Sequence, residues 1–127
     1  MQTLSGVHPR EFITTRQVTD NQGSVTHPSR SYLVISQNIF HQNTETCICL
    51  SLILNPEING SFFEDFNARD IELEAGTRFN QSGKIDCGRI FSFRKGMIEA
   101  KQGMKLTTDV FSRIILRIKN DVIEVTS

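Results

Sequence analysis

Hydrophobic residues along the chain form short runs separated by polar and turn-forming residues, a spacing typical of β-strands. The run at residues 46–54 is almost continuously apolar, as expected for a strand that is covered on both faces. A later run alternates apolar and polar positions and contains Gly88, a candidate β-bulge. The runs that predict strands are residues 12–16, 31–36, 46–54, 71–73 and 84–93.

The hydrophobic spacing changes near the end of the chain. There the apolar residues recur at the three- and four-residue spacing of one helix face, and the basic residues lie mostly off that face. Thr107 or Thr108 is a candidate N-cap, and Asp109 suits the positive end of the helix dipole. The pattern predicts an amphipathic C-terminal helix at residues 107–123.

The strands and the helix together predict a mainly β fold (β plus α), a strongly bent sheet or partial barrel of five to seven strands. Spacing alone does not distinguish this architecture from a sandwich. The 127 residues suit a single domain, residues 1–127, in which residues 1–10 are expected to be a flexible N-terminus. No apolar run reaches the ~18 residues of a transmembrane helix, and the first residues lack the pattern of a secretory signal. We therefore expect a cytoplasmic protein with no membrane partner.

Charge is balanced overall but uneven along the chain. The 14 Lys and Arg residues equal the 14 Asp and Glu residues, which argues against a polybasic binder. Residues 64–74 nevertheless carry five acidic side chains against one basic, and residues 78–119 carry ten basic against three acidic. This division is compatible with a positive face for phosphate groups and equally with a solvated surface that has no partner.

The cysteine pattern gives no indication of a metal site. Cys47 and Cys49 are two residues apart within an apolar run, a spacing unlike that of zinc ligands and too short for a relaxed disulfide along one strand. We expect buried, reduced thiols, no metal site and no cofactor.

Residues 29–55 resemble the MazF/PemK family of toxin endoribonucleases. In that family an arginine opens an aliphatic strand, a loop follows, and a second apolar strand leads into the active site. Here Arg30 takes the place of that arginine, residues 32–36 form the first strand and residues 47–53 the second. Residues 90–98 and 103–118 fit the family's later strand and closing helix. The resemblance implies an SH3-like small barrel.

The resemblance also implies a function. The implied function is that of a growth inhibitor, namely the toxin of a type II toxin–antitoxin system. Such a toxin cleaves single-stranded RNA without a metal ion and leaves a 2′,3′-cyclic phosphate. Two protein partners are implied as well: a second copy in a homodimer, and a cognate antitoxin that covers the RNA groove.

RNA cleavage through the 2′-hydroxyl needs a proton acceptor, a donor for the leaving oxygen and positive charge at the phosphorus. Arg30 supplies a permanent charge and a bidentate grip on phosphate. His27 is a candidate for the group that transfers protons, because an imidazole has an ordinary pKa of ~6.5. Ser51 lies two residues before the family's threonine position and shares its strand face, so its hydroxyl is suited to orienting phosphate or water. The expected catalytic residues are Arg30, His27 and Ser51, and the expected substrate-binding residues are Arg89, Lys84 and Arg16.

Each catalytic candidate has a structural alternative. Arg30 is compatible with an ion pair at the barrel rim, His27 with an exposed loop histidine, and Ser51 with a satisfied core hydroxyl. Ile53 occupies the position of the family's threonine, and its aliphatic side chain neither donates nor accepts a proton. The alternative function is therefore a catalytically degenerate member of the same fold that binds RNA or a partner protein without cleavage.

Overall fold

The computed structural model describes residues 6–123, which form a seven-stranded antiparallel sheet, a separate two-stranded hairpin and two short α-helices. The sheet order is β6-β8-β5-β4-β1-β9-β7. Its strands are β1 (Glu11–Thr15), β4 (Ser31–Val34), β5 (Thr46–Ile53), β6 (Phe63–Phe66), β7 (Ile71–Leu73), β8 (Gly83–Arg94) and β9 (Ile98–Leu106). The other elements are the hairpin strands β2 (Val18–Thr19) and β3 (Val25–His27), the helices α1 (Asn38–Thr44) and α2 (Thr108–Arg117), the 3₁₀ turns η2 (Ala68–Asp70) and η3 (Lys95–Met97), and a π-helical turn, η4 (Ile118–Val122).

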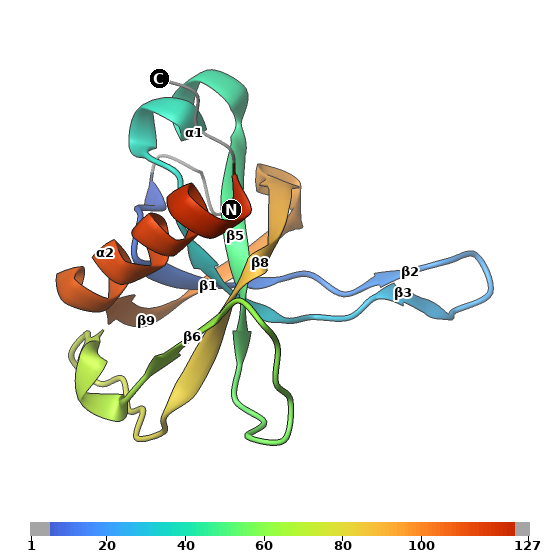
Figure 1. Cartoon of the computed structure of the whole chain (residues 1–127). Helices are drawn as coiled ribbons and strands as arrows, with labels where there is room; N and C mark the ends of the chain where they lie inside the picture. Colours follow the sequence, from blue (N-terminus) through green and yellow to red (C-terminus); the bar gives the residue numbers. More distant parts are fainter. Residues whose placement is uncertain (1–5, 124–127) are drawn as a thin grey trace.

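The two faces of the sheet carry separate hydrophobic clusters. Helix α2 lies across one face (Figure 1), and Val110 and Ile114 of the helix pack there against Leu33 and Leu50 of the sheet. The opposite face collects a second set of buried residues. Its members are Val7, Ile13, Tyr32, Val34, Cys47, Cys49, Phe93 and Ile98. Alternate residues of β5 belong to different clusters, which explains why its sequence is continuously apolar.

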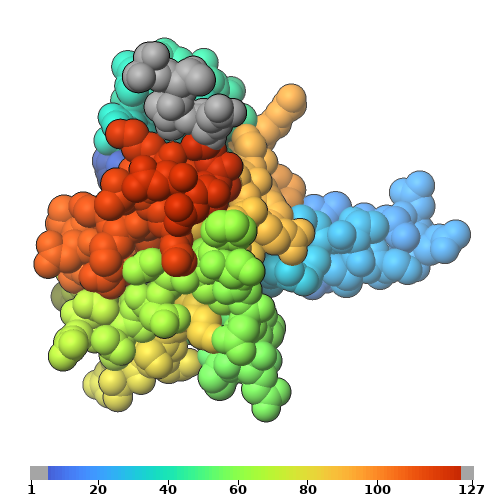
Figure 2. Space-filling view, in the orientation of Figure 1, coloured from blue at the N-terminus to red at the C-terminus, as the bar shows by residue number. Residues whose placement is uncertain are grey.

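The hairpin formed by β2 and β3 projects from the body as an arm (Figures 1 and 2). Its turn follows from local chemistry. The Asp20 carboxylate accepts hydrogen bonds from the backbone N–H groups of Gln22 and Ser24, at 2.8 and 2.9 Å. Gly23 adopts a φ of 83°, which is accessible to glycine without a steric penalty. The arm was not predicted from the sequence, because its strands have only two and three residues.

A bulge in β8 bends the sheet where the candidate site lies. Leu50 and Ser51 are consecutive in β5, yet their partners in β8 are Ile90 and Asp86. The three intervening residues therefore bulge out of the pairing with β5. The Asp86 carboxylate accepts a hydrogen bond from the Gly88 N–H at 2.9 Å, which holds the bulge. The bulge predicted at Gly88 is confirmed.

The two ends of the chain differ in detail from the sequence prediction. Residues 1–5 lie outside the described residues, but Val7 is fully buried, and the Arg10 N–H donates to the Val34 carbonyl at 2.9 Å. Val7 fills a place in the second cluster, so this part of the N-terminal segment packs against the sheet. The flexibility expected of residues 1–10 stays a prediction. At the other end, α2 starts at Thr108 with Thr107 at the N-cap position, and the helical path continues through η4 to Val122.

Two further expectations bear on the class of protein. The three cysteines are free and buried, as predicted, and the Cys47 and Cys49 sulfurs lie 3.6 Å apart. Within residues 6–123, no helix has the length and apolar character needed to cross a membrane.

Candidate functional site

A groove of about 830 Å³ opens at the ends of β4 and β5, beside the bulge of β8. Arg30, Ser51 and Arg89, which the sequence analysis selected separately, all line it. Asp86 lines it as well. The loop that follows β5 provides the opposite wall, through residues such as Ile58 and Phe62. Charged, polar and aromatic side chains therefore border one open cleft.

Arg30 immediately precedes β4 and is fixed through its backbone. Its N–H donates to the Thr15 hydroxyl at 3.3 Å, and its carbonyl accepts from the Thr15 N–H at 2.9 Å. Thr15 is fully buried, so this anchor is rigid while the Arg30 side chain remains exposed. Among the described residues the Arg30 guanidinium makes no ion pair, which argues against a role in a salt bridge at the rim.

Ser51 and Asp86 face each other across β5 and β8. Directly opposed residues of antiparallel strands project to the same side of the sheet, so the hydroxyl and the carboxylate share the groove. Both residues are half-buried. The bond from the Gly88 N–H holds one oxygen of Asp86 in place. Asp86 is the one carboxylate among the residues that line the groove, and Arg30 and Arg89 line the same groove.

Arg89 owes its position to the bulge. It lies at the end of the unpaired segment of β8, is exposed, and has its guanidinium 5.6 Å from the centre of the Phe91 ring. Burial raises the pKa of Tyr32, and the charges of Arg30 and Arg89 partly oppose that shift. Both guanidiniums therefore lower the pKa of the same phenol.

The structure does not place the other three predicted site residues in the groove. His27 ends the hairpin arm, and its ring packs edge-on against Phe93, with centres 5.9 Å apart. Arg16 follows β1, and its N–H donates to the Met97 carbonyl at 2.8 Å. Neither His27 nor Arg16 lines the groove.

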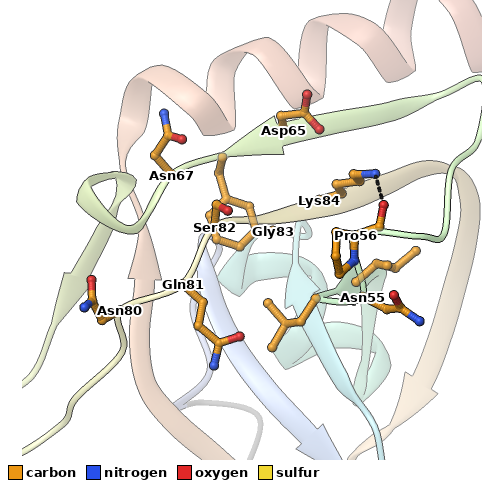
Figure 3. Close-up of a pocket in the computed structure, with 12 residues that line it drawn as sticks. Asn55, Pro56, Asp65, Asn67, Asn80, Gln81, Ser82, Gly83 and Lys84 are labelled. Atoms are coloured by element: carbon orange, nitrogen blue, oxygen red, sulfur yellow. Dashed lines mark hydrogen bonds between the residues drawn. The ribbon is translucent and has the colours of Figure 1, made fainter.

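Lys84 stands behind the wall of the groove and holds the loop that follows β5. Its ammonium group donates to the Ile58 carbonyl at 3.0 Å and to the Asn59 side-chain oxygen at 2.6 Å. A longer contact of 3.5 Å reaches the Pro56 carbonyl (Figure 3). These bonds make Lys84 a residue that positions the wall, rather than a cation directed at phosphate.

No group of three or more metal-ligating side chains occurs among residues 6–123. The polar groups that line the groove are two guanidiniums, one carboxylate, three serine hydroxyls and two asparagine amides.

Comparisons with known proteins agree on the architecture. No protein-family model matches the chain, and no curated protein matches its sequence. Solved structures do match. MazF from Deinococcus radiodurans superposes with a TM-score of 0.59 at 16% identity, over 87% of this chain and 91% of that one. The chain has a MazF-like fold.

Two further MazF-like structures extend this result. The Mycobacterium tuberculosis toxin MazF-mt6 gives a TM-score of 0.56 at 10% identity, over 87% of this chain and 99% of that one. A mycobacterial endoribonuclease in complex with its cognate antitoxin gives 0.59 at 11% identity, over 87% and 89%. At such identities the likeness concerns the fold alone. The mainly β architecture with a C-terminal helix, predicted from the sequence, is thereby confirmed.

Sequence reasoning missed Asp86 as a residue of the groove. An isolated aspartate in an alternating strand gives no signal by itself, and its partner Ser51 lies 35 positions earlier in the sequence. Their pairing depends on the bulge, which shifts the register of β8 against β5 by three residues. Ile53 also lines the groove, two residues from Ser51 on the same strand face, as the sequence analysis expected.

Proposed function

We propose that this chain is a single-domain, cytoplasmic MazF-like toxin that cleaves single-stranded RNA without a metal ion. The observation that carries the proposal is the convergence of Arg30, Arg89 and Asp86 on one open groove of a MazF-like fold. RNA has a phosphate at every step, and a groove with paired guanidiniums attracts such a chain. The Asp86 carboxylate lines the same groove and is the group proposed to act as a base.

The proposed reaction is an internal transesterification. Asp86 accepts the proton of the 2′-hydroxyl as that oxygen attacks the neighbouring phosphorus. Arg30 and Arg89 hydrogen-bond the phosphate oxygens, where negative charge increases in the transition state. Ser51 donates a hydrogen bond to the same phosphate. The 5′-oxygen leaves and takes a proton from solvent in the open groove, which gives a 2′,3′-cyclic phosphate and a 5′-hydroxyl.

The direct test is incubation of the purified chain with a long single-stranded RNA in EDTA, followed by analysis of the new ends. We expect cleavage, with a 2′,3′-cyclic phosphate on one fragment and a 5′-hydroxyl on the other. An RNA that carries a 2′-deoxynucleotide at the mapped site should resist cleavage there, because the nucleophile is missing. Cleavage of the deoxy substrate at the same bond would contradict this mechanism.

A second candidate function is RNA binding without cleavage. Ile53 favours it, because an aliphatic side chain stands in the groove at the position where the resemblance implies a threonine. In that case the RNA is retained on a filter but stays intact, and expression of the chain alone leaves bacterial growth unaffected.

We also propose two protein partners, a second copy of this chain and a cognate antitoxin. Support comes from the matched structures, which include a MazE–MazF complex from Deinococcus radiodurans. Sedimentation equilibrium of the purified chain, which has a mass of 14.4 kDa, distinguishes a monomer from a dimer directly. Co-purification with the product of an adjacent small gene tests for the antitoxin.

A further inference from the structure

A second pocket adjoins the groove and has a different chemistry. Its volume is about 640 Å³, and it lies between the loop after β5, the end of β6 and the segment before β8 (Figure 3). Ile53, Leu54 and Asn55 line both the pocket and the groove, so the two hollows are neighbours. Lys84 in the pocket and Asp86 in the groove are two residues apart on β8, about 6.6 Å along a strand.

Carboxamides dominate the polar lining of this second pocket. They belong to Asn55, Asn67, Asn80 and Gln81, which come from three different segments (Figure 3). Asn80 and Gln81 are exposed, and within residues 6–123 their side chains make no hydrogen bond. The Asn55 side-chain oxygen accepts from the Glu57 N–H at 3.0 Å, which leaves its amide nitrogen as a donor.

The apolar part of the lining is formed by Phe66 and Leu54 beside Gly83. A Cβ at Gly83 would lie 2.6 Å from the Phe66 ring and 2.9 Å from Leu54, so only glycine allows these side chains to pack against the strand here. The pocket thus combines an apolar surface with neutral carboxamides that both donate and accept, and one carboxylate, that of Asp65, also lines it. Lys84, the pocket's cation, is engaged by Ile58 and Asn59 of the loop.

We propose that this second pocket is a nucleobase-recognition subsite, which binds one unstacked base of single-stranded RNA beside the cleaved linkage. The inference rests on the proposed function and extends it to sequence preference. Proteins read single-stranded RNA through bases that are turned out of the stack and hydrogen-bonded at their edges. Carboxamides match those edges, because each presents a donor and an acceptor side by side. A phosphate, by contrast, requires a cation, and Lys84 is already bound to the loop.

The variant that tests the subsite is Asn80→Ala combined with Gln81→Ala, with Gln42→Ala on helix α1 as the matched control. All three side chains are exposed, so each protein should fold, and Gln42 lines neither hollow. Binding is measured by fluorescence anisotropy in an Asp86→Asn background, which prevents cleavage and keeps both guanidiniums. The probes are single-stranded RNAs of one sequence, with one abasic site moved along the strand.

We expect one abasic position to weaken binding about tenfold for Asp86→Asn and for its Gln42→Ala derivative. In the Asn80→Ala/Gln81→Ala derivative that penalty should fall below about twofold. An unchanged penalty at the same position overturns the subsite but leaves RNA binding by the groove intact. Failure of the Asp86→Asn protein to bind any of these RNAs, together with no cleavage by the native chain, overturns the proposed function itself.

Cleavage mapping provides an independent readout. The 5′-hydroxyl ends produced from a long RNA are sequenced for the native chain and for the Asn80→Ala/Gln81→Ala variant. We expect the native chain to prefer one base at a fixed position beside the cleaved bond and the variant to lose that preference. Identical preferences would overturn the subsite even though both proteins cleave.

Discussion

The buried contact between Ser36 and His41 gives a prediction whose magnitude follows from the structure. The Ser36 hydroxyl oxygen lies 2.6 Å from His41 Nε2 and accepts a hydrogen bond from the Ile48 N–H at 2.8 Å. His41 Nδ1 lies 3.0 Å from the Val7 carbonyl, which can only accept. His41 therefore carries its proton on Nδ1, and Nε2 accepts from Ser36. This network joins the N-terminal segment, α1 and β5.

The substitution Ser36→Ala removes both bonds of the hydroxyl and leaves two groups without a partner. His41 is 1% exposed, and the imidazole nitrogen cannot reach water without a local opening. An unsatisfied buried polar group costs about 1–3 kcal/mol. Because Ile48 is half-buried, the cost of leaving its N–H without a partner lies at the lower end of that range. We expect the free energy of unfolding to fall by about 3 kcal/mol, against a typical total of about 5–15 kcal/mol.

Urea unfolding followed by circular dichroism measures this loss. With a slope of about 1.5 kcal/mol per molar urea, the midpoint should fall by about 2 M with the slope unchanged. Ser92→Ala, at an exposed position of β8, is the matched control and should change stability by less than about 0.5 kcal/mol. A loss below about 1 kcal/mol for Ser36→Ala would refute the reasoning, because it would mean that water replaces the hydroxyl.

Three further predictions concern pH, catalysis and the wall of the groove. Burial lowers the pKa of His41, so below its ordinary value of 6.5 the unfolded chain binds more protons than the folded chain. Neutral His41 therefore makes its full contribution to the free energy of unfolding above that pH, and this contribution is lost as the pH falls toward the lowered pKa. Urea titrations at several pH values should show that the free energy of unfolding decreases less with falling pH for His41→Gln than for the native chain. Asp86→Asn should reduce the rate of RNA cleavage about 10²–10⁴-fold while RNA binding, measured by anisotropy, is retained. Weakened binding with an unchanged rate would contradict a role for Asp86 as the base. Lys84→Ala should accelerate proteolysis at residues 55–61, because three contacts to that loop are lost. The free energy of unfolding should change by less than about 1 kcal/mol. An unchanged rate of proteolysis would show that contacts other than those of Lys84 hold the loop.

The architecture was predictable from the sequence where a pattern was long. The run at residues 46–54 corresponds to β5 (Thr46–Ile53), and the C-terminal helical spacing corresponds to α2 and η4. The helix α1 and the strand β6 were not predicted, because α1 has only seven residues and β6 carries two acidic residues between Phe63 and Phe66. Local turn chemistry formed the β2–β3 arm instead, and His27, the last residue of β3, does not line the groove.

The candidate site was predictable only in part, because it depends on register. Arg30 and Ser51 follow from the sequence once β4 and β5 are recognised as neighbours. The contribution of Asp86 requires the three-residue bulge of β8, and the role of Lys84 requires the path of the loop after β5. Gly88 indicated a bulge, but the three-residue register shift and the path of the loop leave no periodic signal, since both are set by contacts between segments far apart in the chain.

The single-turnover rate of RNA cleavage in EDTA, compared between Arg30→Ala and Arg78→Ala, tests the central claim most directly. Both arginines are exposed, but Arg30 lines the groove and Arg78 does not. Removal of a group that stabilises transition-state charge costs about 10²–10³ in rate, so Arg30→Ala should be slower by that factor and Arg78→Ala should match the native chain. Equal rates in the two variants, or no cleavage by the native chain, would contradict the account.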